Sequence, residues 1–263
     1  MNIKIYYVDA FTETLFKGNP AAVIFSNIKD PLLMQSIAAE NNLSETAFIR
    51  LDNNKYYIRW FSPVSEIDLC GHATLASAFI YFSFIKPEAK EFKVFSQKNG
   101  MLNVYHYPDC LVLDFPKDQV QENIEHTEVI GKILGDVVPK KVLKGRDDLL
   151  VIVENELDVV DFNPDFNLIK QIPVRGMILS APGTDTDFIS RCFFPLTGVD
   201  EDPVTGSAHT TLTPYWSKAL GKKKLTAKQV SKRGGLLSCE DSGERVLIGG
   251  KAILYMTGSI NLP

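Results

Sequence analysis

The residues best suited to proton chemistry lie beside two glycines, Gly71 and Gly206, each of which is expected to begin a helix. His72 follows the first glycine and can donate, accept or titrate a proton near neutral pH. Asp202 lies in a turn shortly before the second glycine, and Ser207 follows it. Unpaired N–H groups at the start of a helix favour a carboxylate or a developing oxyanion. We therefore expect both glycines and Ser207 to bind substrate, with His72 and Asp202 acting beside it.

These residues belong to a sequence signature that occurs twice. Its copies, residues 59–74 and 191–209, share an Arg, a Phe, a Pro and an Asp in the same order, and three further pairs keep their size and character. The second copy alone contains the insertion 201–203. Repetition at half the chain length predicts two homologous lobes, each with a strand, a polar turn and a helix that begins at a glycine. An active site is expected in a cleft between the lobes.

Glu45 is the candidate base. It is a polar residue at the entrance to an otherwise apolar strand expected at residues 46–51. The spacing of the repeat pairs it with Met177, so one lobe provides a carboxylate where the other offers only a thioether. This asymmetry predicts a site with a single carboxylate base. An exposed glutamate or an N-terminal cap is the structural alternative.

Structural explanations also stay open for the turn residues. A glycine can begin a tightly packed helix without binding any ligand, although duplication of the whole setting favours function. Asp202 precedes Pro203, and this pair is a natural turn. An Asx turn is therefore as well supported for Asp202 as a role in orienting a histidine or a substrate ammonium group.

The helices and strands expected around these residues indicate an α+β fold. The segment 71–84 is apolar or small on every side, which is typical of a buried helix. Its counterpart is expected at residues 206–220, where Pro214 must kink or interrupt the helix. Each lobe is thus expected to be a curled, barrel-like β-sheet around one central helix. The expected boundaries are 1–118 and 119–263, and the last strand is able to return to the first lobe.

Composition limits the classes of partner. The 263 residues are 45% hydrophobic and 23% charged, with a net charge of −4, as in globular proteins. The basic run 222–224 follows an expected helix and fits its carboxyl end, so no nucleic-acid partner is expected. No apolar stretch approaches the ~20 residues that cross a bilayer, so no membrane association is expected.

The amino terminus and the cysteines bear on location and metal content. Residues 1–9 resemble a β-strand rather than a signal peptide, so a cytoplasmic location is expected. The four cysteines are far apart and have no histidine cluster at metal-ligand spacing. We therefore expect free thiols and no metal site.

Four motifs in order, at residues 19–23, 43–48, 70–74 and 202–208, resemble the phenazine-biosynthesis-protein-F-like (PhzF-like) family over essentially the whole chain. The resemblance implies the diaminopimelate epimerase fold, with two pseudo-symmetric lobes and the site between them. It also implies that Glu45 removes a proton from carbon and returns it elsewhere on the substrate. Residues matching His72, Asp202 and Ser207 surround the ligand in that family, and Asn19 of the first motif is expected to contact it. No cofactor is implied, and a homodimer is expected.

The related cofactor-independent epimerases and proline racemases use two opposed thiols. Cys70 looks like the first of their cysteines, but the second lobe has Thr205 at the matching position. Because a two-base racemase needs an acid on each face of the stereocentre, loss of one thiol argues against racemisation. Our hypothesis is a cofactor-independent isomerase of a small, carboxylate-bearing metabolite. The alternatives are a Cys70-dependent racemase or epimerase, and a non-catalytic metabolite-binding or interaction protein.

Overall fold

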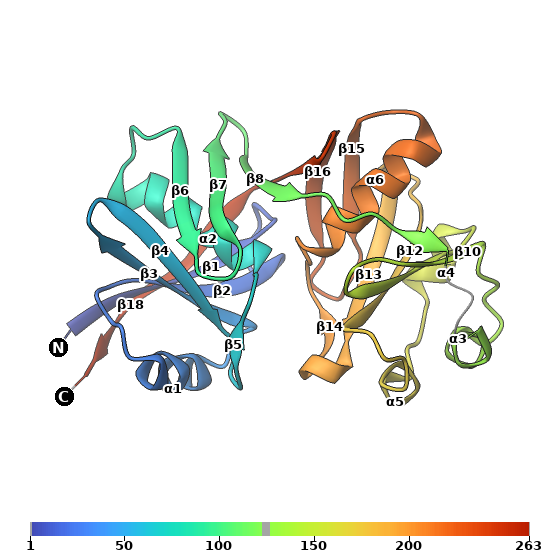
Figure 1. Cartoon of the computed structure of the whole chain (residues 1–263), viewed down its shortest axis with the longest axis horizontal. Helices are drawn as coiled ribbons and strands as arrows, with labels where there is room; N and C mark the ends of the chain where they lie inside the picture. Colours follow the sequence, from blue (N-terminus) through green and yellow to red (C-terminus); the bar gives the residue numbers. More distant parts are fainter. Residues whose placement is uncertain (1, 123–126, 263) are drawn as a thin grey trace. The chain divides into compact units, whose positions relative to one another are not determined.

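The computed structural model describes residues 2–122 and 127–262, and the chain divides into two compact units (Figure 1). The first unit comprises Met1–Phe115 and Gly249–Pro263, and the second comprises Pro116–Ile248. The last strand, β18 (Ala252–Asn261), pairs antiparallel with β1 (Asn2–Ala10), which places the carboxyl-terminal segment in the first unit. Among the described residues, no helix is both long and apolar enough to span a membrane.

Strands of the first unit pair mainly as antiparallel neighbours, with parallel pairing of β2 to β3 and of β4 to β6. The remaining elements are β2 (Asn19–Phe25), α1 (Pro31–Asn41), β3 (Glu45–Asp52), β4 (Lys55–Phe61), β5 (Glu66–Ile67), α2 (Gly71–Ile80), β6 (Glu91–Ser96), β7 (Gly100–His106) and β8 (Leu111–Pro116). Helix α1 begins after the cap Asp30, whose Oδ1 accepts from the Leu32 N–H at 2.9 Å. Its apolar side packs with β1, β2 and β3 in one buried cluster.

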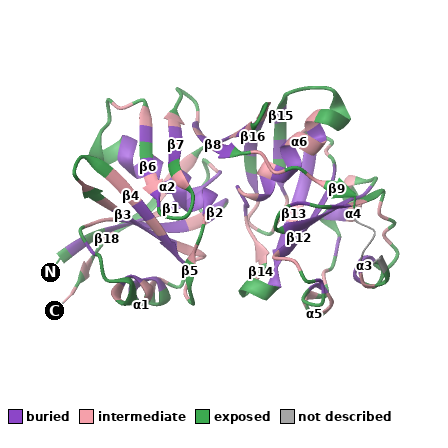
Figure 2. Ribbon diagram, viewed as in Figure 1, coloured by how far each residue is buried: buried purple, intermediate pink, exposed green. Residues whose placement is uncertain are grey.

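Helix α2 is the buried helix that the sequence predicts (Figure 2). It begins at Gly71 and packs against β1, β2 and β3, and it continues as a π-helical turn, Tyr81–Ile85. Its buried hydroxyls are satisfied within the helix. Thr74 Oγ1 donates to the Cys70 carbonyl at 2.5 Å, and Ser77 Oγ donates to the Ala73 carbonyl at 2.6 Å. Small and apolar side chains on every side therefore allow strands to surround the helix.

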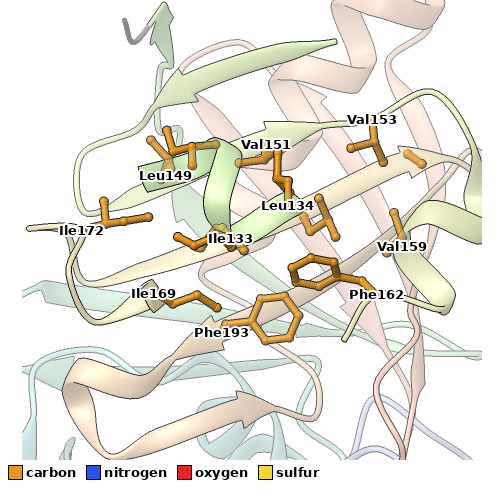
Figure 3. Close-up of a cluster of buried hydrophobic side chains, with 14 of the residues drawn as sticks. Ile133, Leu134, Leu149, Val151, Val153, Val159, Phe162, Ile169, Ile172 and Phe193 are labelled. Carbon is orange, nitrogen blue, oxygen red and sulfur yellow. The ribbon is translucent and has the colours of Figure 1, made fainter. Parts of the chain in front are cut away.

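The second unit repeats this plan with more helices. Its elements are β9 (Gln121–Glu122), α3 (Thr127–Leu134), β10 (Lys141–Lys144), β11 (Asp148–Ile152), α4 (Glu156–Val160), α5 (Phe166–Ile169), β12 (Gly176–Pro182), β13 (Phe188–Phe194), β14 (Val199–Asp202), α6 (Ala208–Leu220), β15 (Lys224–Gln229), β16 (Gly235–Ser242) and β17 (Arg245–Gly250). Figure 3 shows Ile133 and Leu134 of α3 meeting Val151 of β11 and Phe193 of β13 in one apolar cluster. Helix α6 packs against β11, β15 and β16.

Helix α6 corrects two expectations. It begins at Ala208 rather than at Gly206, because Gly206 and Ser207 form a tight turn in which the His209 N–H donates to the Gly206 carbonyl. The helix also runs without interruption through Pro214. Proline removes one helical hydrogen bond, but the buried face of α6 keeps the helix packed on the sheet, so tertiary contacts override local propensity. This face consists of Ala208, His209, Thr211, Leu212, Thr213 and Trp216.

The strand register corrects the expected pairing of Glu45 with Met177. In the first unit Thr46 lies opposite Phe61, and in the second unit Met177 lies opposite Phe193. Because Phe61 and Phe193 match in the repeat, Met177 corresponds to Thr46. The counterpart of Glu45 is therefore Gly176. The sequence spacing is wrong by one residue because the segment from Thr46 to Phe61 is one residue shorter than the segment from Met177 to Phe193.

Gly176 leaves room for an aromatic ring, which leads to a stability prediction. A Cβ at this position would lie 2.1 Å from Phe194 Cδ1 and 2.6 Å from the Phe193 carbonyl oxygen. Gly176→Ala is expected to lower the free energy of unfolding by at least about 1–3 kcal/mol, as overpacking of a core does. Gly131→Ala in α3 is the control: a Cβ there meets no atom within 4 Å, so a gain of about 0.5–1 kcal/mol is expected. Urea unfolding measures both, and wild-type stability of Gly176→Ala would contradict the packing.

Candidate active site

Glu45 is the first residue of β3 and lies beside Ala21 of the parallel strand β2. Its side chain is only 14% exposed, which makes it one of the few largely buried carboxylates in the first unit. Glu45 Oε2 lies 3.1 Å from His72 Nε2. The strand and the start of α2 thus bring together the two residues that the sequence selects for proton transfer.

His72 is buried in the first turn of α2, with a contact on each side of its ring. Asn19 Nδ2 lies 3.0 Å from His72 Nδ1, and Cys70 Sγ lies 3.5 Å from the same nitrogen. The Asn19 amide can serve either state of the ring: its nitrogen donates to Nδ1 of a neutral imidazole, and its oxygen accepts from Nδ1 of a protonated one. Asn19, expected to contact substrate, thus contacts the ring that adjoins the candidate base.

The pKa values of His72 and Cys70 favour protonated groups next to the Glu45 carboxylate. Burial by itself lowers the pKa of His72, but the Cys70 sulfur and the Glu45 carboxylate outweigh burial and hold the pKa above its ordinary value. Burial raises the pKa of the Cys70 thiol to about 11, even though His72 opposes this change. Cys70 is therefore a thiol at neutral pH, and a thiol is a weak base and nucleophile.

Among the described residues, one group of side chains offers three potential metal ligands close together: Glu45, Cys70 and His72, with ligand atoms within 4.8 Å of one another. A thiol must lose its proton to bind a metal ion. The raised pKa of Cys70 works against this loss.

Asp202, Gly206 and Ser207 lie together on the turn of the second unit that precedes α6. Asp202 ends β14, and its Oδ2 accepts a hydrogen bond from Thr205 Oγ1 at 2.5 Å. Gln229, which is fully buried, clamps the same turn. Its Oε1 accepts from the Thr205 N–H at 2.8 Å, and its Nε2 donates to the Asp202 carbonyl at 2.7 Å.

The Asp202 side chain thus accepts a hydrogen bond from Thr205 within its own turn, as the hypothesis of a structural Asx turn requires. They also fix the position of its carboxylate next to the start of α6. Both hypotheses for Asp202 are therefore compatible with the geometry. Gln229 has no counterpart in the repeated signature, and no sequence pattern distinguished it.

Ser207 contacts a residue that the sequence interpretation missed. Arg175 Nη2 lies 3.4 Å from Ser207 Oγ, and the guanidinium pairs with Asp148 through two hydrogen bonds of 2.9 and 2.5 Å. The only sequence signal for Arg175 is its place directly before Gly176, the counterpart of Glu45. That signal depends on the correct strand register.

His209 serves the core of the second unit. It is fully buried, and its Nδ1 lies 2.8 Å from the Thr205 carbonyl oxygen. Because a carbonyl only accepts, Nδ1 carries the proton of the neutral ring. Burial lowers the pKa of His209 to about 4, so the ring is neutral under ordinary conditions.

The two units define an α+β fold of the epimerase class. A hydroxyproline epimerase from Agrobacterium vitis shares it, with a TM-score of 0.63 over 98% of this chain and 92% of that chain at 10% identity. A PhzF-family phenazine biosynthesis protein from Enterococcus faecalis is far more similar, with a TM-score of 0.94 and 44% identity over 100% of both chains. The predicted fold class, two lobes of the diaminopimelate epimerase type, is confirmed.

The chain belongs to the phenazine biosynthesis-like protein family, whose model matches residues 8–258. A relative in Halalkalibacterium halodurans, named an uncharacterized isomerase, is 44% identical over 266 residues and covers 100% of both chains. A relative of the same description in Pseudomonas aeruginosa is 46% identical over 264 residues, again with 100% of both chains covered. The predicted family is confirmed, and these relatives support an isomerase.

Proposed function

We propose that this protein is a cofactor-independent isomerase that moves a proton between carbons of a small metabolite bearing a carboxylate. Glu45 acts as the base that removes the proton and the acid that returns it. The observation that carries this proposal is the buried contact of 3.1 Å between Glu45 and His72. A carboxylate in this setting can alternate between its two protonation states beside a ring that holds a proton.

The other predicted residues have roles that support this transfer. In this proposal, N–H groups at Gly71 and near Gly206 stabilise negative charge that develops on the substrate. Ser207 provides a hydroxyl at the second turn, and Asp202 orients the ligand or a neighbouring group. Asn19 contacts His72 and thereby orients the ring toward Glu45. We also propose a cytoplasmic homodimer, in keeping with the resemblance on which that expectation rests.

A ligand screen followed by product analysis tests the proposed class of reaction. Acidic metabolites are screened for thermal stabilisation, because a ligand that binds the folded state raises its stability by mass action. Each ligand that stabilises the protein is then incubated with it, and the product is examined by mass spectrometry and NMR. An isomerase yields a product of unchanged mass with a proton at a new carbon. Tight binding without any conversion would instead support the metabolite-binding alternative.

The Cys70-dependent alternative makes a different prediction for Cys70→Ser. Because the thiol is protonated at neutral pH, it is not expected to supply the base. Cys70→Ser is therefore expected to change turnover less than about tenfold, which corresponds to about 1.4 kcal/mol in the barrier. Steady-state kinetics on the substrate found in the screen measures this change. A much larger loss, with thermal stability unaltered, would favour the racemase or epimerase.

A further inference from the structure

The two units place opposite charges beside corresponding turns. In the first unit the Glu45 carboxylate contacts His72, which follows the glycine of the turn. In the second unit Ser207 takes the place of His72, and Gly176 takes the place of Glu45. Arg175, directly before Gly176, brings a guanidinium to 3.4 Å from Ser207 Oγ. A cation therefore adjoins Ser207, whereas an anion adjoins its counterpart His72.

The guanidinium of Arg175 is held in place on two sides. Asp148, on the strand next to Gly176, accepts hydrogen bonds from Nε and Nη2 of Arg175 at 2.9 and 2.5 Å. The ring of Phe194 lies under the guanidinium, with its centroid 5.2 Å from Cζ. The missing Cβ of Gly176 is what lets this ring approach so closely. Such a fixed side chain loses little further conformational entropy when it binds a ligand.

Burial of the ion pair between Arg175 and Asp148 suggests a role in binding, because stability alone does not account for it. The Asp148 side chain is 4% exposed, and taking such a charge out of water costs several kcal/mol, which ion pairing often only offsets. Arg175 is 35% exposed, so one part of it faces solvent. Within the described residues, its Nη1 group donates no hydrogen bond to the protein. Burial disfavours the charged guanidinium, but Asp148 outweighs burial and holds the pKa of Arg175 above its ordinary value.

We propose that Arg175 is a substrate-binding residue that recognises a carboxylate together with Ser207. The Nε edge of the guanidinium is committed to Asp148, and the second Nη2 proton faces Ser207 Oγ at 3.4 Å, so a carboxylate would accept from Nη1 with one oxygen and from the Ser207 hydroxyl with the other. Ser207 Oγ is the polar group of the turn that lies next to the guanidinium. Asp148 fixes the guanidinium through its two hydrogen bonds.

This inference deepens the proposed function and rests on it, because the bound carboxylate is a substrate only if the protein is an isomerase. Its test, however, measures binding alone. The probe is succinate, and its neutral diamide, succinamide, is the matched control ligand. Both are titrated into the wild-type protein and followed by NMR. Wild type is expected to bind succinate at least about tenfold more tightly, because hydrogen bonds to a charged group contribute about 1.5–3 kcal/mol.

The variants separate recognition from folding. Arg175→Gln is expected to weaken succinate binding by about 10–100-fold and to leave succinamide binding unchanged. Arg175→Gln leaves the buried Asp148 carboxylate without its ion-pair partner. The double variant Arg175→Gln with Asp148→Asn removes this unpaired charge and should show the same loss of succinate affinity. Arg59→Gln is the control, since Arg59 also forms a two-bond pair, with Glu66, in the other unit. It should bind succinate as wild type does.

Two results would overturn the assignment: equal affinity of wild type for succinate and succinamide, or wild-type succinate affinity in the folded double variant. Glu45→Gln separates this inference from the proposed function, because it removes the base and leaves Arg175 in place. Succinate binding that depends on Arg175 and persists in Glu45→Gln supports the carboxylate subsite, whether or not wild type moves a proton. Absence of isomerisation would then count against the proposed function alone.

Discussion

Glu45→Gln is expected to reduce turnover by about 10²–10⁴-fold, the usual contribution of a general acid–base residue. Glutamine keeps the size of the side chain at the start of β3 but cannot take up the substrate proton. Ligand binding should persist, because the groups proposed to hold the carboxylate lie elsewhere. The loss should therefore appear in kcat rather than in affinity. Steady-state kinetics measures the first quantity, and a thermal-shift titration with the same ligand measures the second.

The matched control for this prediction is Glu66→Gln. Glu66 is a glutamate of the same unit, but it is more exposed and pairs with Arg59 at the surface. Surface ion pairs contribute little, so this variant should keep wild-type turnover and nearly wild-type stability. Full turnover by Glu45→Gln would refute the role of the carboxylate. Equal losses in both variants would trace the effect to general electrostatics instead.

Stability is expected to fall by about 3 kcal/mol between pH 7 and pH 4 because of His209 alone. In the unfolded chain this histidine has an ordinary pKa near 6.5, whereas burial lowers it to about 4 in the folded state. As the pH falls below 6.5, the unfolded chain takes up a proton that the folded protein does not bind. The stabilising contribution is thus complete above pH 6.5 and is lost toward pH 4. Each pKa unit corresponds to about 1.4 kcal/mol.

His209→Asn isolates this effect, because its amide can replace the hydrogen bond to the Thr205 carbonyl and does not titrate. The variant is expected to be less stable at pH 7, yet its unfolding free energy should depend less on pH between 6.5 and 4. Urea unfolding at several pH values measures the slope. A wild-type slope in His209→Asn would contradict the assignment.

Local patterns in the sequence were sufficient for the elements of the first unit that carry the site. The all-apolar segment after Gly71 forms the buried helix α2, and Glu45 does begin a strand. The family resemblance implies that Glu45 and His72 act at one site, and their direct contact was added by the structure. The structure then added Asn19 and Cys70 as the neighbours of His72.

Features that depend on tertiary context could not be predicted. The register that pairs Gly176 with the position of Glu45 depends on a one-residue difference in the length of chain between the paired strand positions, which spacing alone does not reveal. Helix α6 tolerates Pro214 because one face is buried against strands. The pair of Arg175 with Asp148 joins residues 27 positions apart in the chain, and neither lies in the repeated signature.

Hydrogen exchange at carbon tests the central claim most directly. A ligand identified by thermal stabilisation is incubated in D₂O with wild type, Cys70→Ser and Glu45→Gln, and deuterium at its carbons is followed by NMR. If Glu45 is the base, wild type and Cys70→Ser should incorporate deuterium into the ligand, whereas Glu45→Gln should bind the ligand without exchange. Exchange that survives in Glu45→Gln and disappears in Cys70→Ser would contradict the account.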